Sequence, residues 1–135
     1  MTVFFAVNGT LMRGLELNPN LIAAGGEFVR EAVTQPCYRL WTIEDRHPAM
    51  LRVRSGGAAI QLEIWRMPLA TLGLILLQEP PGLSIGKIAL ADESEVLGVL
   101  GEPYLCEGQV EITQWGGWRQ YIAAKAETLS NGAHP

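Results

Sequence analysis

The stretch that decides the fold is Val3-Phe4-Phe5-Ala6-Val7, followed at once by Asn8-Gly9-Thr10-Leu11-Met12-Arg13-Gly14. A short run of β-branched and aromatic residues that ends at Asn-Gly is typical of a buried strand that breaks into a tight turn. Gly9 has no Cβ, so a ligand can approach the backbone closely there. Successive free N–H groups in such a turn form a concave donor site for a carboxylate or an oxyanion. The turn is therefore either a small-molecule site or an ordinary exit from a strand.

Outward from this turn, the pattern predicts many short strands and few helices. Strands are expected at residues 28–34, 38–43, 50–54 and 58–67, then a hairpin of 87–90 and 95–100 around Asp92-Glu93-Ser94. Helices are expected from Asn18-Pro19 to about residue 24, over 69–77, and from Gly116 onward. Asn18 would cap the first helix, and the second, apolar all round, would be buried against the sheet. Without regular β–α alternation, the pattern indicates an α+β domain with a mixed or antiparallel sheet.

The composition predicts a single domain over residues 1–129, with a flexible tail at 130–135. The chain of 135 residues is 48% hydrophobic and 18% charged, which is enough to bury a core without disulfides or metal. No apolar segment reaches the ~18 residues of a membrane span, and no basic region precedes the first apolar run, so we expect a cytoplasmic protein. A net charge of −4 without a basic cluster argues against nucleic acid and membrane as partners.

Cysteine and histidine usage argues against a metal site. Cys37 and Cys106 are the only cysteines, they lie far apart, and both have apolar neighbours, so we expect buried, reduced and dispensable thiols. His47 lies beside Pro48 in the polar segment 44–49 and is expected at the surface, and His134 lies in the tail. We therefore expect no bound metal.

Four segments resemble known families. Residues 8–14 resemble the Tyr-Gly-Ser/Thr-Leu signature that follows the first strand of γ-glutamylcyclotransferases. The C-terminal domain of allophanate hydrolases, itself of cyclotransferase-like fold, is similar to Leu83-Ser84-Ile85-Gly86-Lys87, Gly98-Val99-Leu100-Gly101-Glu102 and Ile112-Thr113-Gln114-Trp115-Gly116-Gly117-Trp118-Arg119. The resemblance covers about residues 3–122 and implies a γ-glutamylcyclotransferase-like fold, a small mixed β-barrel with peripheral helices.

Glu79 is the candidate catalytic residue. It ends an apolar helix before Pro80-Pro81, where desolvation would raise its pKa and suit it to proton transfer, although a carboxylate at a helix end also simply points to solvent. The resemblance places the catalytic glutamate of cyclotransferases at this position. The chain departs from that pattern at Leu76, where aspartate is usual, and at Pro80, where glycine is usual. It also has Asn8 in place of tyrosine, and Leu11 near a histidine of allophanate hydrolase domains.

Other residues have a structural and a functional interpretation. Glu102 either pairs structurally with Arg119 or Arg39 or belongs to the site. The Trp115–Arg119 segment either locks the chain into its last helix, with Trp118 packed in the core, or directs Arg119 into the cavity to bind a carboxylate. In that second arrangement, Tyr38 and Arg39 would assist.

The resemblance implies a stand-alone protein that acts on or binds a small carboxylate-bearing amide or a urea-derived metabolite, without a cofactor. Glu79 would be catalytic, and the substrate would be bound by Asn8, Gly9, Thr10, Leu11 and Arg119. We expect residues 8–11 and 78–81 to face each other across the mouth of the cavity. The reaction would be that of a γ-glutamylcyclotransferase-like transferase or a step in allophanate breakdown. The alternative is a non-catalytic accessory subunit of an amidase, and both hypotheses leave the oligomeric state open.

Overall fold

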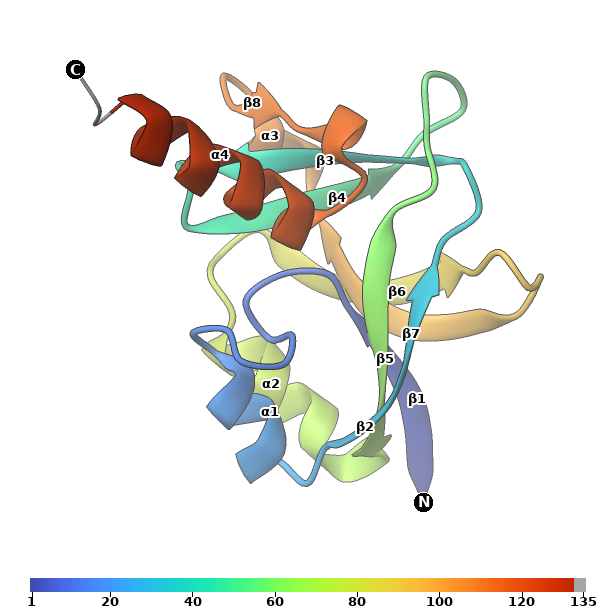
Figure 1. Ribbon diagram of the computed structural model, residues 1–135. Helices are drawn as coiled ribbons and strands as arrows, with labels where there is room; N and C mark the ends of the chain where they lie inside the picture. Colours follow the sequence, from blue (N-terminus) through green and yellow to red (C-terminus); the bar gives the residue numbers. More distant parts are fainter. Residues whose placement is uncertain (133–135) are drawn as a thin grey trace.

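Two sheets form the frame of the computed structural model, which describes residues 1–132 (Figure 1). One sheet has five strands in the order β2-β5-β1-β7-β6, and the other has three in the order β4-β3-β8. The strands are β1 (Thr2–Val7), β2 (Glu27–Val33), β3 (Tyr38–Ile43), β4 (His47–Arg52), β5 (Gln61–Pro68), β6 (Leu83–Ala89), β7 (Glu95–Gly101) and β8 (Val110–Glu111). The α-helices are α1 (Asn18–Ala23), α2 (Leu72–Gln78), α3 (Pro103–Cys106) and α4 (Trp118–Gly132), with 3-10 turns at Leu69–Thr71 and Thr113–Trp115.

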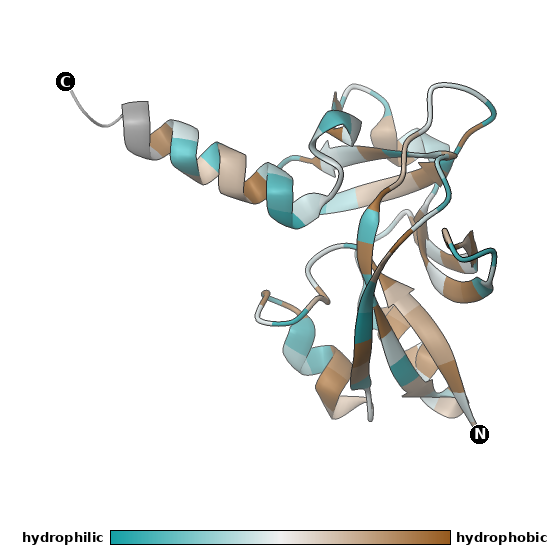
Figure 2. Cartoon of the chain, turned by 45° about the vertical axis from the view of Figure 1, so that its right-hand side comes forward, coloured by the Kyte–Doolittle hydropathy of each residue, from teal (hydrophilic) through white to brown (hydrophobic). Residues whose placement is uncertain are grey.

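The predicted first strand lies at the centre of the larger sheet. β1 pairs antiparallel with β5 and parallel with β7, so the sheet is mixed, as expected. Central strands are covered on both faces, which explains why Phe5, Ala6 and Val7 are fully buried. Figure 2 shows the resulting concentration of apolar residues along these strands. The hairpin of β6 and β7 is confirmed, with the register Ala89↔Glu95 next to its turn.

The barrel implied by the resemblance is corrected: the described strands form two sheets that do not close on each other. The edge strands β2 and β6 meet only beyond their ends, at a single bridge between Thr34 and Leu90. The Gln35 N–H still donates to the Ala89 carbonyl at 2.9 Å, but the Ala89 N–H does not donate back to Gln35, so the ladder does not continue. The chain then starts the second sheet at Tyr38, whose hydroxyl accepts a hydrogen bond from the Ala89 N–H at 2.9 Å.

The two short helices differ from expectation in their details. Asn18 does not cap α1; its buried side chain donates to the Leu11 carbonyl at 2.8 Å and holds the loop after β1. α2 is not buried all round, because only Leu72 and Ile75 face the core, whereas Leu74 and Leu77 are 57% and 84% exposed. In Figure 1, α1 and α2 lie below the smaller sheet and to the left of the lower ends of β1, β2 and β5.

The C-terminal helix α4 begins against the smaller sheet and extends away from it (Figures 1 and 2). Trp118 and Tyr121 anchor its first turns in the core. The helix continues through Gly132, over the first residues of the expected tail, and residues 133–135 lie outside the described part of the chain. None of the helices in the described residues is long and apolar enough to cross a membrane.

Candidate functional site

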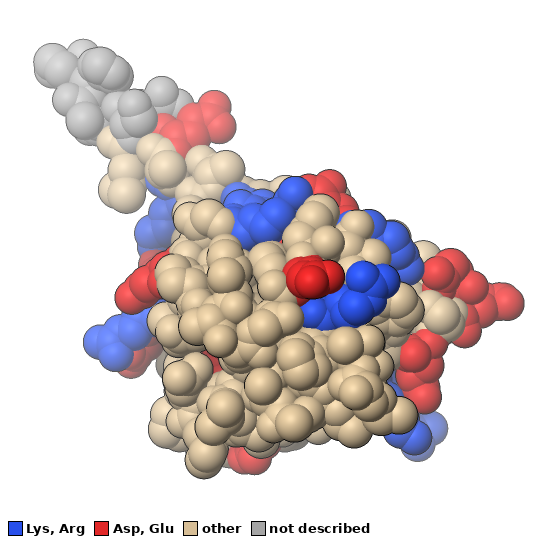
Figure 3. Space-filling model, turned by 90° about the horizontal axis from the view of Figure 1, so that it is seen from below, with Lys and Arg blue, Asp and Glu red and all other residues tan. Residues whose placement is uncertain are grey.

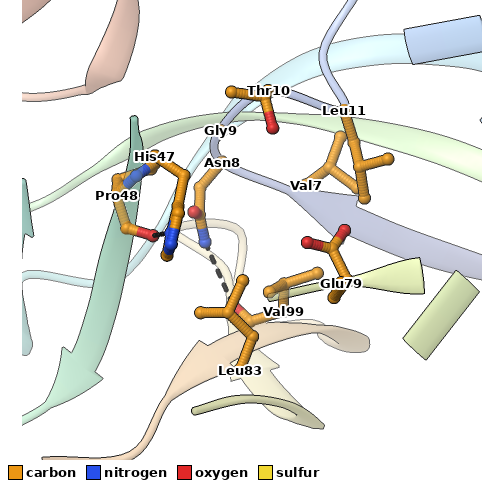
Figure 4. A pocket seen from close by; sticks show the side chains of 10 residues that line it. All are labelled: Val7, Asn8, Gly9, Thr10, Leu11, His47, Pro48, Glu79, Leu83 and Val99. Atoms are coloured by element: carbon orange, nitrogen blue, oxygen red, sulfur yellow. Dashed lines mark hydrogen bonds between the residues drawn. The ribbon is translucent and has the colours of Figure 1, made fainter. Parts of the chain in front are cut away.

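A narrow pocket lies where β1 ends. Its lining comes from the end of β1 and the following loop, the start of β4, the residue after α2, and strands β6 and β7: Val7, Asn8, Gly9, Thr10, Leu11, His47, Pro48, Glu79, Leu83 and Val99 (Figure 4). The volume that a water-sized molecule can occupy is about 20 Å³, which is enough for one water or for the terminal atoms of a ligand. The structure thus brings residues 8–11 and Glu79 to one pocket, although they lie far apart in the sequence.

The loop after β1 is held by its carbonyl groups. The Gly9 carbonyl accepts from the Met12 N–H at 3.0 Å, and the Thr10 carbonyl accepts from the Leu17 N–H at 3.0 Å. The Leu11 carbonyl accepts from Asn18. No acceptor within the described residues pairs with the N–H groups of Gly9, Thr10 or Leu11. Successive N–H groups without a protein acceptor, at the lining of a pocket, favour a bound anion or water.

Asn8 and Gly9 fix the position of this loop. The buried Asn8 amide donates to the Val99 carbonyl of β7 at 3.0 Å. A Cβ on Gly9 would lie 2.6 Å from Pro48 Cδ, so any larger residue would displace the loop from β4. The glycine therefore serves close packing against Pro48, and the approach of a ligand to its backbone is restricted on that side.

Glu79 supplies a carboxyl group to the lining of the pocket. It caps the C-terminus of α2 in an extended conformation, and its own N–H donates to the Leu76 carbonyl at 3.2 Å. Within the described residues no donor reaches its carboxylate. Burial without compensation raises the pKa of Glu79 to about 7, so both protonation states are populated at neutral pH.

His47 was expected at the surface, and this expectation is wrong. It is 9% exposed, pairs with Ile43 at the start of β4, and lines the same pocket as Glu79. Its Nδ1 lies 3.0 Å from the Pro48 carbonyl. A carbonyl oxygen only accepts, so Nδ1 carries a proton. The apolar run Pro48-Ala49-Met50-Leu51 signals that the strand begins earlier than residue 50.

Arg119 does not line this pocket. Its Nη2 contacts the Glu63 carboxylate at 3.0 Å, and Glu63 also accepts from the Arg13 N–H and from Trp65 Nε1. Burial alone would raise the pKa of Glu63, but these hydrogen bonds outweigh it and hold the pKa below its ordinary value. The arginine therefore serves a buried structural cluster, and no local pattern around Glu63 signals it.

The proposed pairing of Glu102 with Arg119 or Arg39 is also wrong. Arg39 pairs with Glu111 of β8, and Glu102 is exposed. Tyr38 is fully buried beneath the smaller sheet, so neither it nor Arg39 reaches the pocket. Trp118 packs against Tyr121 with ring centroids 5.8 Å apart. The turn before it uses Gly116 at φ +79°, a conformation that favours glycine.

Comparison with known proteins shows which family this chain resembles in sequence and fold. The family model of the allophanate hydrolase C-terminal domain matches residues 3–123. The chain belongs to the allophanate hydrolase C-terminal domain family. It is 28% identical to the urea amidolyase of Saccharomyces cerevisiae over 90% of this chain, but spans only 7% of that protein's length.

Several solved structures are similar to this chain. A uropathogenic E. coli-specific protein superposes with a TM-score of 0.90 at 61% identity, over 91% of this chain and 97% of the other. Kluyveromyces lactis allophanate hydrolase gives a TM-score of 0.86 at 28% identity, over 92% of this chain and 21% of the enzyme. An aig2-like protein from Mus musculus, with a TM-score of 0.58 at 16% identity over 77% of this chain and 78% of that protein, shares the fold alone. The cyclotransferase-like resemblance is thus confirmed at the level of fold.

Proposed function

We propose that the pocket at the end of β1 binds the carboxylate end of a small amide or urea-derived molecule, and that Glu79 transfers a proton to it. One arrangement carries the proposal: the Glu79 carboxyl shares a pocket with the N–H groups of Gly9, Thr10 and Leu11, which have no acceptor within the described residues. Successive N–H groups in a turn suit an anion, and burial raises the pKa of Glu79 to about 7, which suits proton transfer at neutral pH.

The substrate we favour is the N-carboxylated product of an amidase. The similar proteins are named for allophanate and for urea, both of which belong to urea chemistry. In the proposed step, protonated Glu79 gives its proton to the carbamate nitrogen. The bond between that nitrogen and the carboxylate carbon breaks, its electron pair stays on nitrogen, and CO2 leaves. Glu79 then regains a proton from water, and no cofactor is needed.

The electrostatics of the pocket favour an acid over a base. A substrate carboxylate bound beside Glu79 would repel the ionised form and raise the pKa of Glu79 further above about 7. Decarboxylation uses the protonated form that this repulsion favours. Cyclotransfer would instead need ionised Glu79 to take a proton from an α-amine, with residues 9–11 holding the oxyanion. We therefore rank decarboxylation above cyclotransfer.

The test compares the wild-type protein with Glu79→Gln, using Glu127→Gln on the exposed surface of α4 as the matched control. Substrates are freshly generated amidase product and γ-glutamyl dipeptides, and binding is followed by the thermal shift with malonate. We expect Glu79→Gln to lower turnover by ~10²–10⁴-fold and to keep the malonate shift, because the backbone donors remain. Wild-type protein that neither turns over a substrate nor binds malonate would refute the proposal.

The second candidate is an accessory subunit that docks on an amidase, and an exposed apolar surface favours it. Ile22 of α1 and Leu74 and Leu77 of α2 are 56%, 57% and 84% exposed. Figure 3 shows that most of the face seen from below carries neither acidic nor basic residues. Large exposed apolar patches often mark interaction sites. Co-elution with an amidase that Leu77→Lys abolishes, without any turnover by this chain, would favour this candidate.

A further inference from the structure

A second cavity lies on one face of the larger sheet, between β2 and the β6–β7 hairpin, and we propose that it binds a small organic ammonium ion with an apolar body. Its volume is about 300 Å³, at the lower end of the ~300–1,000 Å³ that is usual for small-molecule pockets. Its lining comes from β1, β2, β5, the hairpin turn and the start of β7. It shares no lining residue with the pocket of Glu79, so this inference is independent of the proposed function.

The strand register brings the apolar residues of this cavity to one face. Ala6 pairs with Ile64 of β5 on one side and with Gly98 of β7 on the other. Side chains two positions apart in a strand lie on the same face, so Phe4 and Val96 share the face of Ala6. Ile64 is 2% exposed and Phe4 is 48% exposed. The cavity therefore has a buried apolar floor and an accessible phenyl ring.

A β-bulge in β2 directs two consecutive residues to the cavity. Phe28 pairs with Trp65 of β5. Arg30 pairs with Ile64, the residue next to Trp65, so Val29 is the extra residue of the bulge. In a regular strand Val29 and Arg30 would lie on opposite faces, but both line this cavity. Bulges re-aim side chains in this way beside functional sites.

The cavity lies where the edges of the larger sheet do not pair. The edges meet at the bridge between Thr34 and Leu90, and Figure 1 shows the hairpin of β6 and β7 extending to the right of β2. Away from that bridge, the Arg30 guanidinium reaches the Asp92 carboxylate of the hairpin turn at 3.4 Å. These two side chains are 48% and 56% exposed, so the ion pair forms part of the rim and leaves the apolar floor accessible.

The charges around the cavity leave one carboxylate without a partner. Arg30 is paired with Asp92. The Arg66 guanidinium, which lies 5.6 Å from the centre of the exposed phenyl ring, is 3.8 Å from the Glu27 carboxylate. Glu95, which lines the cavity at the start of β7, has no ion-pair partner among the described residues. An unpaired carboxylate at the rim of an apolar cavity favours a cation on an apolar body.

The two parts of the ligand have different roles. The apolar body lies against Ile64 and Val96, and its removal from water supplies most of the affinity. The ammonium group lies beside Glu95. An exposed ion pair is weak, so Glu95 contributes selectivity for a cation over a neutral molecule of the same shape.

The test compares phenethylamine with 2-phenylethanol, a neutral molecule of similar size and shape, by NMR titration of the backbone amides. We expect phenethylamine to shift the Ile64 and Val96 signals and to bind about two- to fivefold more tightly than the alcohol, as for an exposed ion pair. Glu95→Gln should remove this preference. Glu93→Gln changes a carboxylate of the same turn that does not line the cavity, so this matched control should keep it.

A second variant tests the cavity itself. Val96→Phe places a ring in the space for the apolar body and should abolish binding of both molecules, and the Glu95→Gln comparison stands even if Val96→Phe does not fold. Equal binding of the two molecules by wild type would overturn the proposal, as would shifts confined to residues 8–11. Absence of saturable phenethylamine binding at millimolar concentrations would also overturn it, and would leave the proposed function of the Glu79 pocket untouched.

Discussion

Glu63 and Glu79 are two carboxylates that the same fold treats in opposite ways. Glu63 is 1% exposed and receives hydrogen bonds from two arginines and a tryptophan, so its pKa is held low. Glu79 receives none within the described residues, and burial raises its pKa to about 7. The hydrogen bonds to Glu63 stabilise its ionised form, whereas Glu79 can gain and lose a proton near neutral pH. Only Glu79 suits acid–base chemistry.

The raised pKa of Glu79 predicts that wild-type stability declines with pH. The folded protein holds this proton more tightly than the unfolded chain, so the free energy of unfolding falls as pH rises from ~4.3 through about 7. Glu79→Gln lacks this titration. We expect the free energy of unfolding of Glu79→Gln, relative to that of wild type, to rise by about 1–3 kcal/mol between pH ~5 and pH ~8.5, as measured by urea unfolding. If the two proteins differ by the same free energy of unfolding at both pH values, the prediction that Glu79 titrates with a raised pKa is contradicted.

The Glu63 cluster predicts a large loss of stability. Glu63→Ala leaves Arg13 and Arg119 without their shared partner, and we expect a loss of about 3–5 kcal/mol in the free energy of unfolding. Glu102→Ala, at an exposed position, is the control and should change it by less than about 0.5 kcal/mol. Similar effects of the two substitutions would mean that the cluster is not the stabilising feature we infer.

The two thiols are predicted to have no role in the site. Cys37 and Cys106 are both free, and burial raises the pKa of Cys106 to about 11, so it does not act as a thiolate at neutral pH. The Cys37→Ala/Cys106→Ala double variant should therefore keep its malonate thermal shift. Loss of that shift in a variant that remains folded would overturn this expectation.

At the scale of elements, the sequence predicted the turns, because turns depend on the residues that form them. The turn after β1 and the β6–β7 hairpin follow from Asn8-Gly9 and from Asp92-Glu93-Ser94, whose side chains and backbone favour turns. The exposure of α2 was not predictable, because leucines on every side do not reveal which side meets the sheet. His47 was misplaced because residues 44–49 were interpreted as a polar turn, although the apolar run from Pro48 belongs to the strand that pairs with β3.

α2 provides a direct test of which face is buried. Ile75 is 2% exposed and faces the core, so Ile75→Ala should cost about 2–5 kcal/mol in urea unfolding. Leu77 is 84% exposed, so Leu77→Ala should change stability by less than about 0.5 kcal/mol. A large cost at Leu77 would instead show that this surface is covered in solution, as the accessory-subunit candidate requires.

At the scale of the whole molecule, the topology of the fold brings the residues of the site together from distant parts of the sequence. Residues 8–11 follow the central strand β1, Glu79 follows α2, and His47 opens a strand of the other sheet. The resemblance anticipated the first two, since it carries the family's arrangement. It misdirected Arg119, whose partner Glu63 lies on the distant strand β5, and Glu102, which is exposed. The small mixed β-barrel that the resemblance implied was not found, because the edges of the larger sheet meet at one bridge only.

The central claim is that Glu79 is a proton-transfer group beside an anion site, and its carboxyl ¹³C signal tests this most directly. The signal would be followed by NMR through a pH titration, with and without saturating malonate. We predict a midpoint at about 7 in the free protein that moves upward when malonate binds, because the neighbouring negative charge disfavours ionisation. A midpoint near ~4.3, as for an exposed glutamate, that malonate leaves unchanged would contradict the account.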